Sequence, residues 1–186
     1  MRFVPTALAG SYVVEIEKKV DSRGFFGRSW CEAEMKRHQL NGHIAQINIS
    51  RSAVRGTLRG LHYQVAPYRE CKMIRCTKGA IFDVIVDLRP DSPTFLRWFG
   101  AELTEENHLA LYSPEGFAQG FVTLEDDTEI LYTTSQTYAA GYDWGVRWDD
   151  PQLRIELPVE VVSISDKDKS WPDFTRQYLD KTNLGV

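Results

Sequence analysis

The sequence predicts an all-β domain, a jelly-roll barrel with a few short flanking helices. Most of the chain reads as short segments of β-branched and aromatic residues separated by turn-forming residues. Only a small part of it has the composition of a helix. The length of 186 residues, without a linker-like stretch or an internal repeat, predicts a single domain over residues 1–186.

The predicted strands follow one another through most of the chain. Residues 45–50 alternate polar and apolar side chains, as in a half-buried strand. Residues 81–88 form a more continuous apolar run, typical of a central strand, which the prolines of residues 89–93 end. Further strands are predicted at residues 12–16, 71–76, 95–103, 108–113, 119–123, 129–136 and 153–156. This succession favours a barrel or a sandwich.

Two short helices are expected beside the strands. Residues 31–39 are rich in Glu, Ala, Met and Lys, which lose little side-chain freedom in a helix. A second, shorter helical segment is expected near residues 170–178. These are the flanking helices of the predicted fold.

Composition and charge argue against several classes of partner. Charged residues make up 26% of the chain and the net charge is −4, without a basic stripe, so we expect no nucleic-acid partner. No apolar run approaches the roughly 20 residues needed to cross a bilayer, and residues 1–5 lack an apolar signal segment, so we expect no membrane partner. Cys31, Cys71 and Cys76 lack a CxxC spacing, which favours free thiols in the reducing cytosol. The sequence thus predicts a cytoplasmic protein.

Jelly rolls of the cupin type often bind a metal, and the positions of that motif are present. Metal-binding cupins use G-x5-H-x-H with a later Glu, followed by P-x-G-x2-H. Here the four ligand positions hold His62, Gln64, Glu70 and Gln119. A neutral amide is a poor ligand for the transition metals that imidazole suits. We therefore expect no metal, and a metal-dependent oxygenase stays an alternative that metal analysis would test.

The densest polar segment covers residues 51–64. In a regular strand Arg59 and His62 lie on opposite faces, whereas a bulge at Gly60 brings both into one cavity. Lys72 lies on the next predicted strand. A lone histidine is usually a satisfied core residue, but a core with so many polar groups would be costly. A ligand-binding cavity is the better explanation.

Two later segments supply candidate acids and bases. Tyr132 and Tyr138 are six residues apart, an even spacing that puts both on one face if the strand stays regular, although aromatic residues are common in any strand. Asp168 ends the segment SISDKD at residues 163–168, and its carboxylate can fold back on a histidine. Such a charged segment is otherwise an ordinary solvated turn, so these residues alone leave its role open.

Several blocks occur in an order and at a spacing typical of one family. They are DSRGFF (21–26), QIN (46–48), RGLHYQ (59–64), KMIR (72–75), DVIVDLR (83–89), SPTF (92–95), PEGFAQGF (114–121), Tyr132, WDDP (148–151) and KD (167–168). As a set they make the chain similar to the dTDP-4-dehydrorhamnose 3,5-epimerase family over its whole length. The resemblance implies a cupin-like jelly roll, a nucleotide-sugar substrate and a homodimer in which strands are exchanged between subunits.

The resemblance also implies roles for individual residues. His62 corresponds to the general base, Asp168 to the carboxylate that orients it, Tyr132 to the general acid, and Lys72 to the residue near the 4-keto oxygen of the sugar. Substrate-binding positions are matched by Arg23 and Arg59 at the diphosphate, Gln46, Asn48 and Asp143 at the nucleotide, Tyr138 in the pocket lining, and Phe26, Arg28, Gln119 and Lys167.

These residue types suit proton transfer beside a ketone. Removing the proton leaves an enolate, whose charge a cation such as Lys72 stabilises. Histidine is neutral near pH 7 and can act as the base, a carboxylate fixes its tautomer, and a tyrosine across the cavity returns a proton on the opposite face. No cofactor is needed, and the sequence has no Gly-rich nucleotide loop. The main hypothesis is epimerisation of a nucleotide-linked 4-keto-6-deoxyhexose at C3 and C5.

Three residues depart from the family pattern. Arg28 stands where many members have glutamate, Gln119 replaces a common histidine, and Glu70 stands where glutamine is common. Arg28 reverses a charge near the nucleobase or ribose, which argues against thymidine as the nucleoside. Gln119 cannot titrate, which argues against inversion at both C3 and C5. One alternative is a single-carbon epimerase, C3-only or C5-only, for another dTDP-, CDP- or GDP-linked ketosugar. A non-catalytic sugar-nucleotide binding module is the alternative from a different class.

Overall fold

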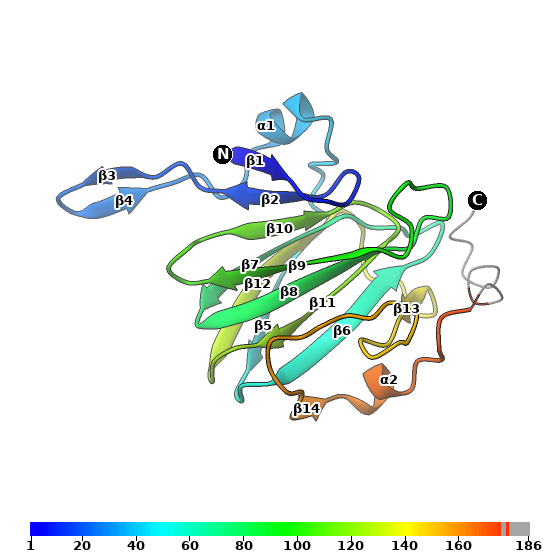
Figure 1. The fold of residues 1–186 in the computed structure, drawn as a ribbon. Coiled ribbons are helices and arrows are strands. Elements are labelled where there is room, and N and C mark those ends of the chain that lie inside the picture. Colours follow the sequence, from blue (N-terminus) through cyan, green and yellow to red (C-terminus); the bar gives the residue numbers. More distant parts are fainter. Residues whose placement is uncertain (176–177, 179–186) are drawn as a thin grey trace.

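The computed structural model describes residues 1–175 and Tyr178. Two six-stranded sheets and a separate two-stranded hairpin make up most of this region (Figure 1). The helices of the described residues are both short, α1 (Glu32–Arg37) and α2 (Asp166–Lys169). The all-β prediction is confirmed.

The first sheet has the strand order β1-β2-β10-β7-β12-β5. In that order the strands are β1 (Arg2–Pro5), β2 (Tyr12–Glu15), β10 (Ala110–Ser113), β7 (Lys72–Lys78), β12 (Thr128–Thr134) and β5 (Gln46–Ser52). All neighbours are antiparallel. Partly buried and exposed residues alternate along most of β5, so its side chains point alternately inward and outward, as its sequence predicts.

The second sheet has the order β13-β6-β11-β8-β9, with β14 parallel to β6. Its strands are β13 (Asp143–Gly145), β6 (Thr57–Gln64), β11 (Phe117–Thr123), β8 (Ala80–Asp87), β9 (Trp98–Thr104) and β14 (Ser163–Ile164). β8 is buried along nearly its whole length, and it lies between β11 and β9. The prediction of a central strand there is confirmed.

The core consists of three clusters of buried side chains. The first lies between the sheets and contains Leu8, Ile74, Cys76, Ile81, Ile85, Leu103, Leu111, Phe117, Phe121 and Ile130. The second lies where the C-terminal part of the chain packs on the second sheet, and it includes Leu61, Tyr63, Val84, Val86, Leu153, Ile155, Phe174 and Tyr178. The third packs α1 on the first sheet, through Phe3, Val14, Met35, Cys71, Met73, Ala110 and Tyr112.

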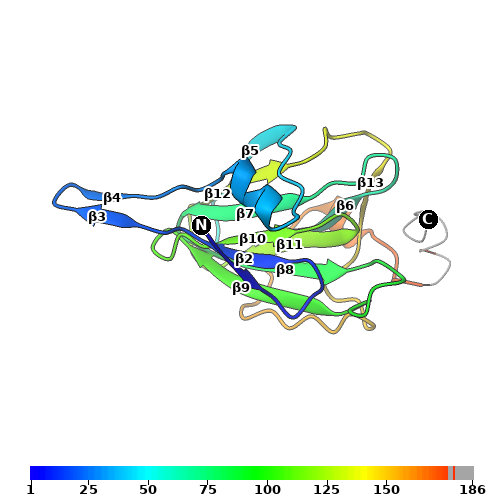
Figure 2. The ribbon, with the colours of Figure 1, turned by 90° about the horizontal axis from the view of Figure 1, so that it is seen from above.

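A hairpin of β3 (Lys19–Asp21) and β4 (Gly24–Phe26), which we call the arm, projects from the barrel in both views (Figures 1 and 2). β3 and β4 pair only with each other. Val20 is 76% exposed and Phe26 67% exposed. The arm thus presents apolar side chains that this chain alone does not cover.

The second predicted helix lies only in part within the described residues. Residues 171–175 have no regular secondary structure, Tyr178 is helical, and residues 176 and 177 lie outside the described residues. A short helix that the sequence analysis did not expect, α2, precedes this segment; the side chain of Ser165 accepts a hydrogen bond from the backbone N–H of Asp168 and so caps its first turn. The helix expected at residues 31–39 is confirmed by α1.

The strand predicted at residues 153–156 is wrong. The side-chain carboxylate of Asp150 accepts a hydrogen bond from the backbone N–H of Gln152, and the backbone carbonyl of Asp150 accepts one from the backbone N–H of Leu153. These two hydrogen bonds form a turn. Arg154 has a φ of 49°, which a strand does not allow. The apolar side chains of this segment are buried without a ladder.

Two other strands differ from their predicted bounds. β9 begins at Trp98 rather than at residue 95, because residues 92–97 form turns in which Leu96 has a φ of 59°. β12 ends at Thr134, two residues before the predicted end. The second difference matters for the site, because it changes where Tyr138 lies.

Two composition-based expectations can be checked directly. Cys31, Cys71 and Cys76 are all free thiols, as predicted. In the described part of the chain, none of the helices has the length and apolar character needed to span a bilayer.

Candidate active site

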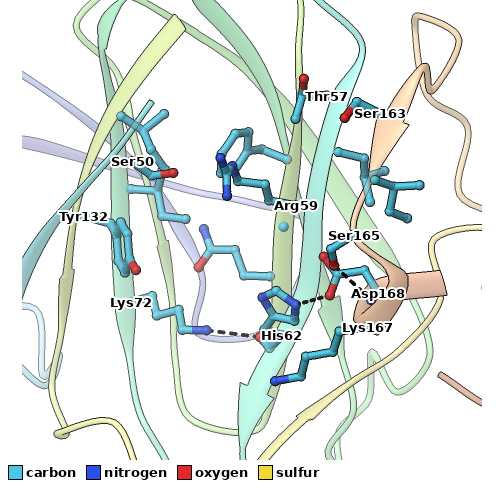
Figure 3. A pocket seen from close by; sticks show the side chains of 17 residues that line it. Ser50, Thr57, Arg59, His62, Lys72, Tyr132, Ser163, Ser165, Lys167 and Asp168 are labelled. Atoms are coloured by element: carbon cyan, nitrogen blue, oxygen red, sulfur yellow. Dashed lines mark hydrogen bonds and ion pairs between the residues drawn. The ribbon is translucent and has the colours of Figure 1, made fainter. Parts of the chain in front are cut away.

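A cavity of about 530 Å³ opens between the two sheets. Ile74, Phe121 and Ile130 belong to the core between the sheets and also line this cavity, so the cavity is the polar end of the same interior space. Its walls come from β5, β6, β7, β11 and β12 and from residues 163–168 (Figure 3). Both sheets and a C-terminal segment therefore contribute to one site.

The bulge predicted at Gly60 is present. Gln119 pairs with His62 and Phe121 pairs with Arg59, so the two paired positions are three residues apart on β6 but only two apart on β11. Gly60 has a φ of 119°, and a Cβ there would lie 2.6 Å from a backbone atom of β11, so only glycine fits. The extra residue puts Arg59 and His62 on the same cavity, as the sequence analysis predicted.

His62 and Asp168 form a hydrogen-bonded pair at the cavity wall. His62 Nε2 lies 2.5 Å from Asp168 Oδ1, and the backbone N–H of Gly60 donates to Asp168 Oδ2 at 3.2 Å. Burial by itself raises the pKa of Asp168, but the hydrogen bonds from His62 and the backbone hold it below its usual value. The carboxylate is therefore an anion at neutral pH.

This pairing leaves the second ring nitrogen of His62 for a ligand. A carboxylate that accepts from Nε2 keeps the proton on that nitrogen, so Nδ1 carries the free lone pair. Nδ1 points toward the cavity (Figure 3), and the His62 side chain is 41% exposed. The geometry leaves an imidazole nitrogen that can accept a proton facing the cavity.

Lys72 extends from β7 into the same cavity, where two acceptors hold its ammonium. Nζ donates to the carbonyl oxygen of His62 at 3.1 Å and lies 3.0 Å from Glu70 Oε1. An ammonium has three N–H donors. These two contacts therefore leave one donor for a ligand.

Tyr132 lies on β12, on the wall opposite His62 (Figure 3). Burial raises the pKa of its phenol, and the nearby carboxylate of Glu70 raises it further, whereas Arg59 lowers it. The phenol thus keeps its proton at neutral pH. It is placed to donate that proton into the cavity.

Arg59 is oriented by the neighbouring strand. Its Nε donates to Ser52 Oγ at 3.1 Å and its Nη2 to the carbonyl of Arg51 at 3.1 Å. The guanidinium has five N–H donors, so several remain for a ligand. A fixed planar fork of this kind suits phosphate oxygens.

Gln119 forms part of the cavity floor and is 3% exposed. Its Nε2 donates to Asp83 Oδ2 at 2.7 Å, and its Oε1 accepts from Ser113 Oγ at 2.5 Å. Burial raises the pKa of Asp83 to about 8, so this carboxyl group holds a proton over much of the neutral range. The two hydrogen bonds thus fix the orientation of the Gln119 amide.

Lys167 also lines the cavity and forms an ion pair with Asp143. The hydrogen bond to Asp143 raises the pKa of Lys167. Gln46 and Asn48 lie on β5 beyond the cavity lining, where Asn48 pairs with Tyr132 in the ladder. The Lys167–Asp143 ion pair and strand β5 thus flank the cavity on two sides.

Tyr138 does not share a strand face with Tyr132. β12 ends before it, and Tyr138 is 62% exposed in the following loop, so the strand does not stay regular as the even-spacing argument requires. The loop is held near β5, because the backbone N–H of Tyr138 donates to Gln46 Oε1 at 2.9 Å. Tyr138 therefore lies near the cavity rim without lining the cavity.

Arg23, Phe26 and Arg28 lie on or beside the arm, and the structure does not bring them to the cavity of their own chain. Arg23 pairs with Asp21 at 2.6 Å and Arg28 with Glu34 at 3.0 Å. The charge reversal at Arg28 is thus balanced within the chain.

The positions of the cupin metal motif make other contacts here. His62 binds Asp168, Glu70 binds Lys72, and the Gln64 amide donates to the carbonyl oxygens of residues 68 and 137. Among residues 1–175 and 178, no three His, Cys, Asp or Glu side chains are placed together to hold a metal.

Sequence reasoning missed part of the lining. Ser50, Thr57, Ser163 and Ser165 add hydroxyl groups to the walls. The spacing of Ser165 and Asp168 is that of a helix N-cap followed by an acid, a signal that predicts a short helix rather than a solvated turn. That signal was available in the sequence.

A jelly roll whose cavity holds a histidine–carboxylate pair, an ammonium and a phenol has the parts of an acid–base enzyme. A family model described as dTDP-4-dehydrorhamnose 3,5-epimerase matches residues 5–176. A relative of that name from Sinorhizobium fredii (strain NBRC 101917 / NGR234) is 41% identical over 173 residues, which cover 92% of this chain and 89% of the relative. The chain therefore belongs to the dTDP-4-dehydrorhamnose 3,5-epimerase family and is an isomerase.

Solved structures agree with the fold. The enzyme of the same name from Bacillus anthracis, with TDP and PPi bound, has a TM-score of 0.89 and 40% identity, covering 93% of this chain and 99% of that one. A dTDP-6-deoxy-D-glucose-3,5-epimerase from Legionella pneumophila, in complex with dTDP-4-keto-L-rhamnose, has a TM-score of 0.85 and 32% identity, covering 94% and 98%. The cupin-like jelly roll is confirmed.

Proposed function

We propose that this protein inverts C3 and C5 of dTDP-4-keto-6-deoxy-D-glucose to form dTDP-4-keto-L-rhamnose. The observation that carries the proposal is the placement of His62 and Tyr132 on opposite walls of one cavity, with Lys72 beside them (Figure 3). Inversion requires a base on one face of the carbon and an acid on the other. The names of the relatives and the ligand of the Legionella pneumophila structure support this substrate.

In this proposal each inversion consists of two proton transfers. Nδ1 of His62 removes the proton from the carbon beside the 4-keto group, and the electron pair moves onto the keto oxygen. The free N–H of Lys72 stabilises the resulting oxyanion. Tyr132 then donates its proton to the opposite face, while Asp168 stabilises the imidazolium. Solvent returns the proton from the imidazole to the phenolate, so no cofactor is consumed.

We assign the charged rim of the cavity to the nucleotide diphosphate. Arg59 presents an oriented guanidinium, and Lys167 adds a second cation beside Asp143. Two cations neutralise the two phosphates of the substrate. The sugar is thereby directed into the cavity toward His62.

The arm supports a homodimer with exchanged strands. Arg23, Phe26 and Arg28 match substrate-binding positions of the family but lie away from the cavity of their own chain. A second copy of the chain offers a cavity that such an arm can complete. In this arrangement Arg23 contacts the diphosphate held by the other subunit, and the apolar side chains of the arm become covered.

The outer face of the first sheet also supports a partner. Ile47 is 60% exposed and Ile49 66% exposed, and both point outward from β5. On the same face Arg75 has two buried guanidinium nitrogens without a hydrogen-bond partner in the described residues, and burial lowers its pKa to about 10. Light scattering should give the mass of a dimer at micromolar concentration, and a monomer mass contradicts this part of the proposal.

We place the protein in the cytosol. Three free thiols, two of them buried, support a reducing compartment. Fractionation that found the protein with secreted or membrane material would contradict this.

Hydrogen exchange from heavy water tests the proposed function. Incubation of the enzyme with dTDP-4-keto-6-deoxy-D-glucose in heavy water should give deuterium at both C3 and C5 by NMR. CDP- and GDP-linked 4-ketosugars serve as controls for the nucleotide. If no 4-ketosugar in the panel takes up deuterium, the enzyme proposal is wrong and a binding module becomes the better reading.

One observation favours a second candidate, single-carbon epimerisation. Gln119 stands where the family commonly has histidine, and its amide, hydrogen-bonded to Asp83 and Ser113, cannot act as an acid or a base near neutral pH. A cavity that lacks the titratable histidine at position 119 fits an enzyme that inverts only one of the two carbons. Deuterium at C3 or C5 alone, with the other position unlabelled, selects this candidate.

A further inference from the structure

Glu70 is a carboxylate behind the cavity lining, in contact with Lys72, that the proposed chemistry does not use. It lies between β6 and β7, and its side chain is only 9% exposed. Oε1 lies 3.0 Å from Lys72 Nζ, and Oε2 accepts from Gln64 Nε2 at 3.4 Å. Burying a carboxylate is unfavourable unless it is paired, so this arrangement calls for a functional explanation.

The neighbouring amide of Gln64 cannot turn to suit another residue at position 70. Its Nε2 donates to the carbonyl oxygens of Tyr68 at 3.1 Å and Thr137 at 3.2 Å, and its Oε1 accepts from the backbone N–H of Ala139 at 2.7 Å. Both N–H donors of Gln64 are thus engaged by carbonyl oxygens, and Glu70 Oε2 adds a third, longer contact at 3.4 Å. The acceptor that matters at position 70 is the one facing Lys72, and a glutamine there offers one acceptor and one donor in place of the two acceptor oxygens of the carboxylate.

We propose that Glu70 is a positioning residue for Lys72: together with the carbonyl of His62 it engages two of the three ammonium donors and directs the third to the keto oxygen. A lysine side chain has a flexible four-carbon stem, so its donors do not point in a fixed direction unless they are held. This inference rests on the proposed function and deepens it.

Glu70 also influences the acid on the opposite wall. Tyr132 faces Arg59 and His62 of β6, Lys72 of β7 and Glu70 of the connecting loop. Among the causes that raise its pKa, Glu70 comes after burial, and Arg59 opposes it. A negative charge disfavours the phenolate, so removing it lowers the pKa of Tyr132. One carboxylate thus serves both the cation and the acid.

Two substitutions separate these effects. Glu70→Gln keeps the shape but loses the charge and one acceptor, whereas Glu70→Asp keeps the charge but is shorter. Glu102→Gln, on the exposed side of β9 and away from the cavity, removes an equal charge as the matched control. Thermal unfolding of all variants establishes that each is folded.

We expect kcat to fall about tenfold in both Glu70 variants, less than the 10²–10³-fold cost of losing an oxyanion donor outright, because Lys72 remains but is less well oriented. KM should change by less than about twofold, since orientation acts in the transition state. The alkaline limb of the kcat profile should move to lower pH in Glu70→Gln and stay in place in Glu70→Asp. Glu102→Gln should match the wild type in all three respects.

A second measurement does not require turnover. The absorbance of the phenolate is titrated against pH in the wild type and in both Glu70 variants, with the Tyr132→Phe signal subtracted. The titration of Tyr132 should shift to lower pH in Glu70→Gln and stay in place in Glu70→Asp. If the wild type is inactive, the proposed function fails and the positioning role of Glu70 fails with it, whereas the titration still shows whether the Glu70 carboxylate acts on Tyr132. Wild-type kcat in Glu70→Gln, an increased kcat, a loss expressed only in KM, or an unshifted titration overturns it.

Discussion

The cavity wall and the arm both carry residues expected to contact the substrate, but they differ in how the chain holds them. On the wall, β6 lies between β11 and β13, and β7 lies between β10 and β12, so His62 and Lys72 are fixed by ladders on both sides. On the arm, β3 and β4 have only each other, and Arg23 pairs with a neighbour two residues away. The difference teaches that the wall residues are held in place by the ladders of this chain, whereas the arm residues are not brought to the cavity of their own chain.

The local environment of two glycines shows the same contrast. Gly60 on the wall and Gly24 on the arm both have a positive φ, of 119° and 124°. A Cβ on Gly60 would lie 2.6 Å from the backbone of β11, whereas a Cβ on Gly24 would meet nothing within 4 Å. The wall is close-packed around its special conformation and the arm is open.

The largest expected effect is on the wall. His62→Ala removes the base and should lower kcat by about 10²–10⁴-fold, because positioned acid–base groups contribute on that scale. Steady-state kinetics with the dTDP-linked ketosugar measures it, and circular dichroism checks the fold. A kcat within tenfold of the wild type would remove His62 from the mechanism and with it the contrast with the arm.

Alanine at the two glycines should separate packing from backbone strain. Gly60→Ala combines strain with a backbone clash and should lower the free energy of unfolding by about 3–4 kcal/mol, whereas Gly24→Ala has strain alone and should lower it by about 1–2 kcal/mol. Urea denaturation measures both. Equal losses would show that the wall is no more tightly constrained than the arm.

Arg23→Ala tests whether the arm reaches a partner. We expect kcat/KM to fall by about 10–100-fold, mainly through KM, because a charge-assisted contact to phosphate is worth about 1.5–3 kcal/mol.

Mixing subunits sharpens this test. In a mixed dimer of His62→Ala and Arg23→Ala chains, exchanged arms put an intact His62 and an intact Arg23 in the same site. Activity should therefore rise above that of either variant alone once the subunits have been unfolded together and refolded. No gain from a mixed dimer of proven composition would show that the arm serves its own chain.

The smallest expected effect concerns acid stability. The hydrogen bonds of Asp168 hold its pKa below the ordinary value of 3.8, so its ionised form stabilises the fold above that pH and the contribution disappears as the pH falls through the lowered pKa. The difference in the free energy of unfolding between the wild type and Asp168→Asn should accordingly shrink on acidification below about pH 4. A difference that stayed constant into strong acid would mean that Asp168 is not held as an anion.

Much of the wall was predictable because strand patterns carry local information. Alternation identified β5, the continuous apolar run identified β8, and the glycine between Arg59 and His62 indicated the bulge that joins them. These features depend on residues close together in the sequence. The His62–Asp168 contact spans 106 residues, so the residues alone left Asp168 as either a base partner or a solvated turn.

Other features could not be read locally. The apolar residues of the segment 153–156 suggested a strand, but the Asp150 turn and the backbone of Arg154 exclude one. The even spacing of Tyr132 and Tyr138 puts both on one face only while the strand stays regular, and β12 ends before Tyr138. The arm residues that match substrate-binding positions do not reach the cavity of their own chain, so neither periodicity nor this single chain reveals what they contact.

The central claim is that one side chain removes the proton from carbon and another, across the cavity, supplies its replacement. Tyr132→Phe separates the two steps. With substrate deuterated at C3 and C5 and enzyme in ordinary water, this variant should release deuterium to solvent while forming no inverted product, and His62→Ala should do neither. Inversion by Tyr132→Phe at the wild-type rate, or continued deuterium release by His62→Ala, would contradict the account.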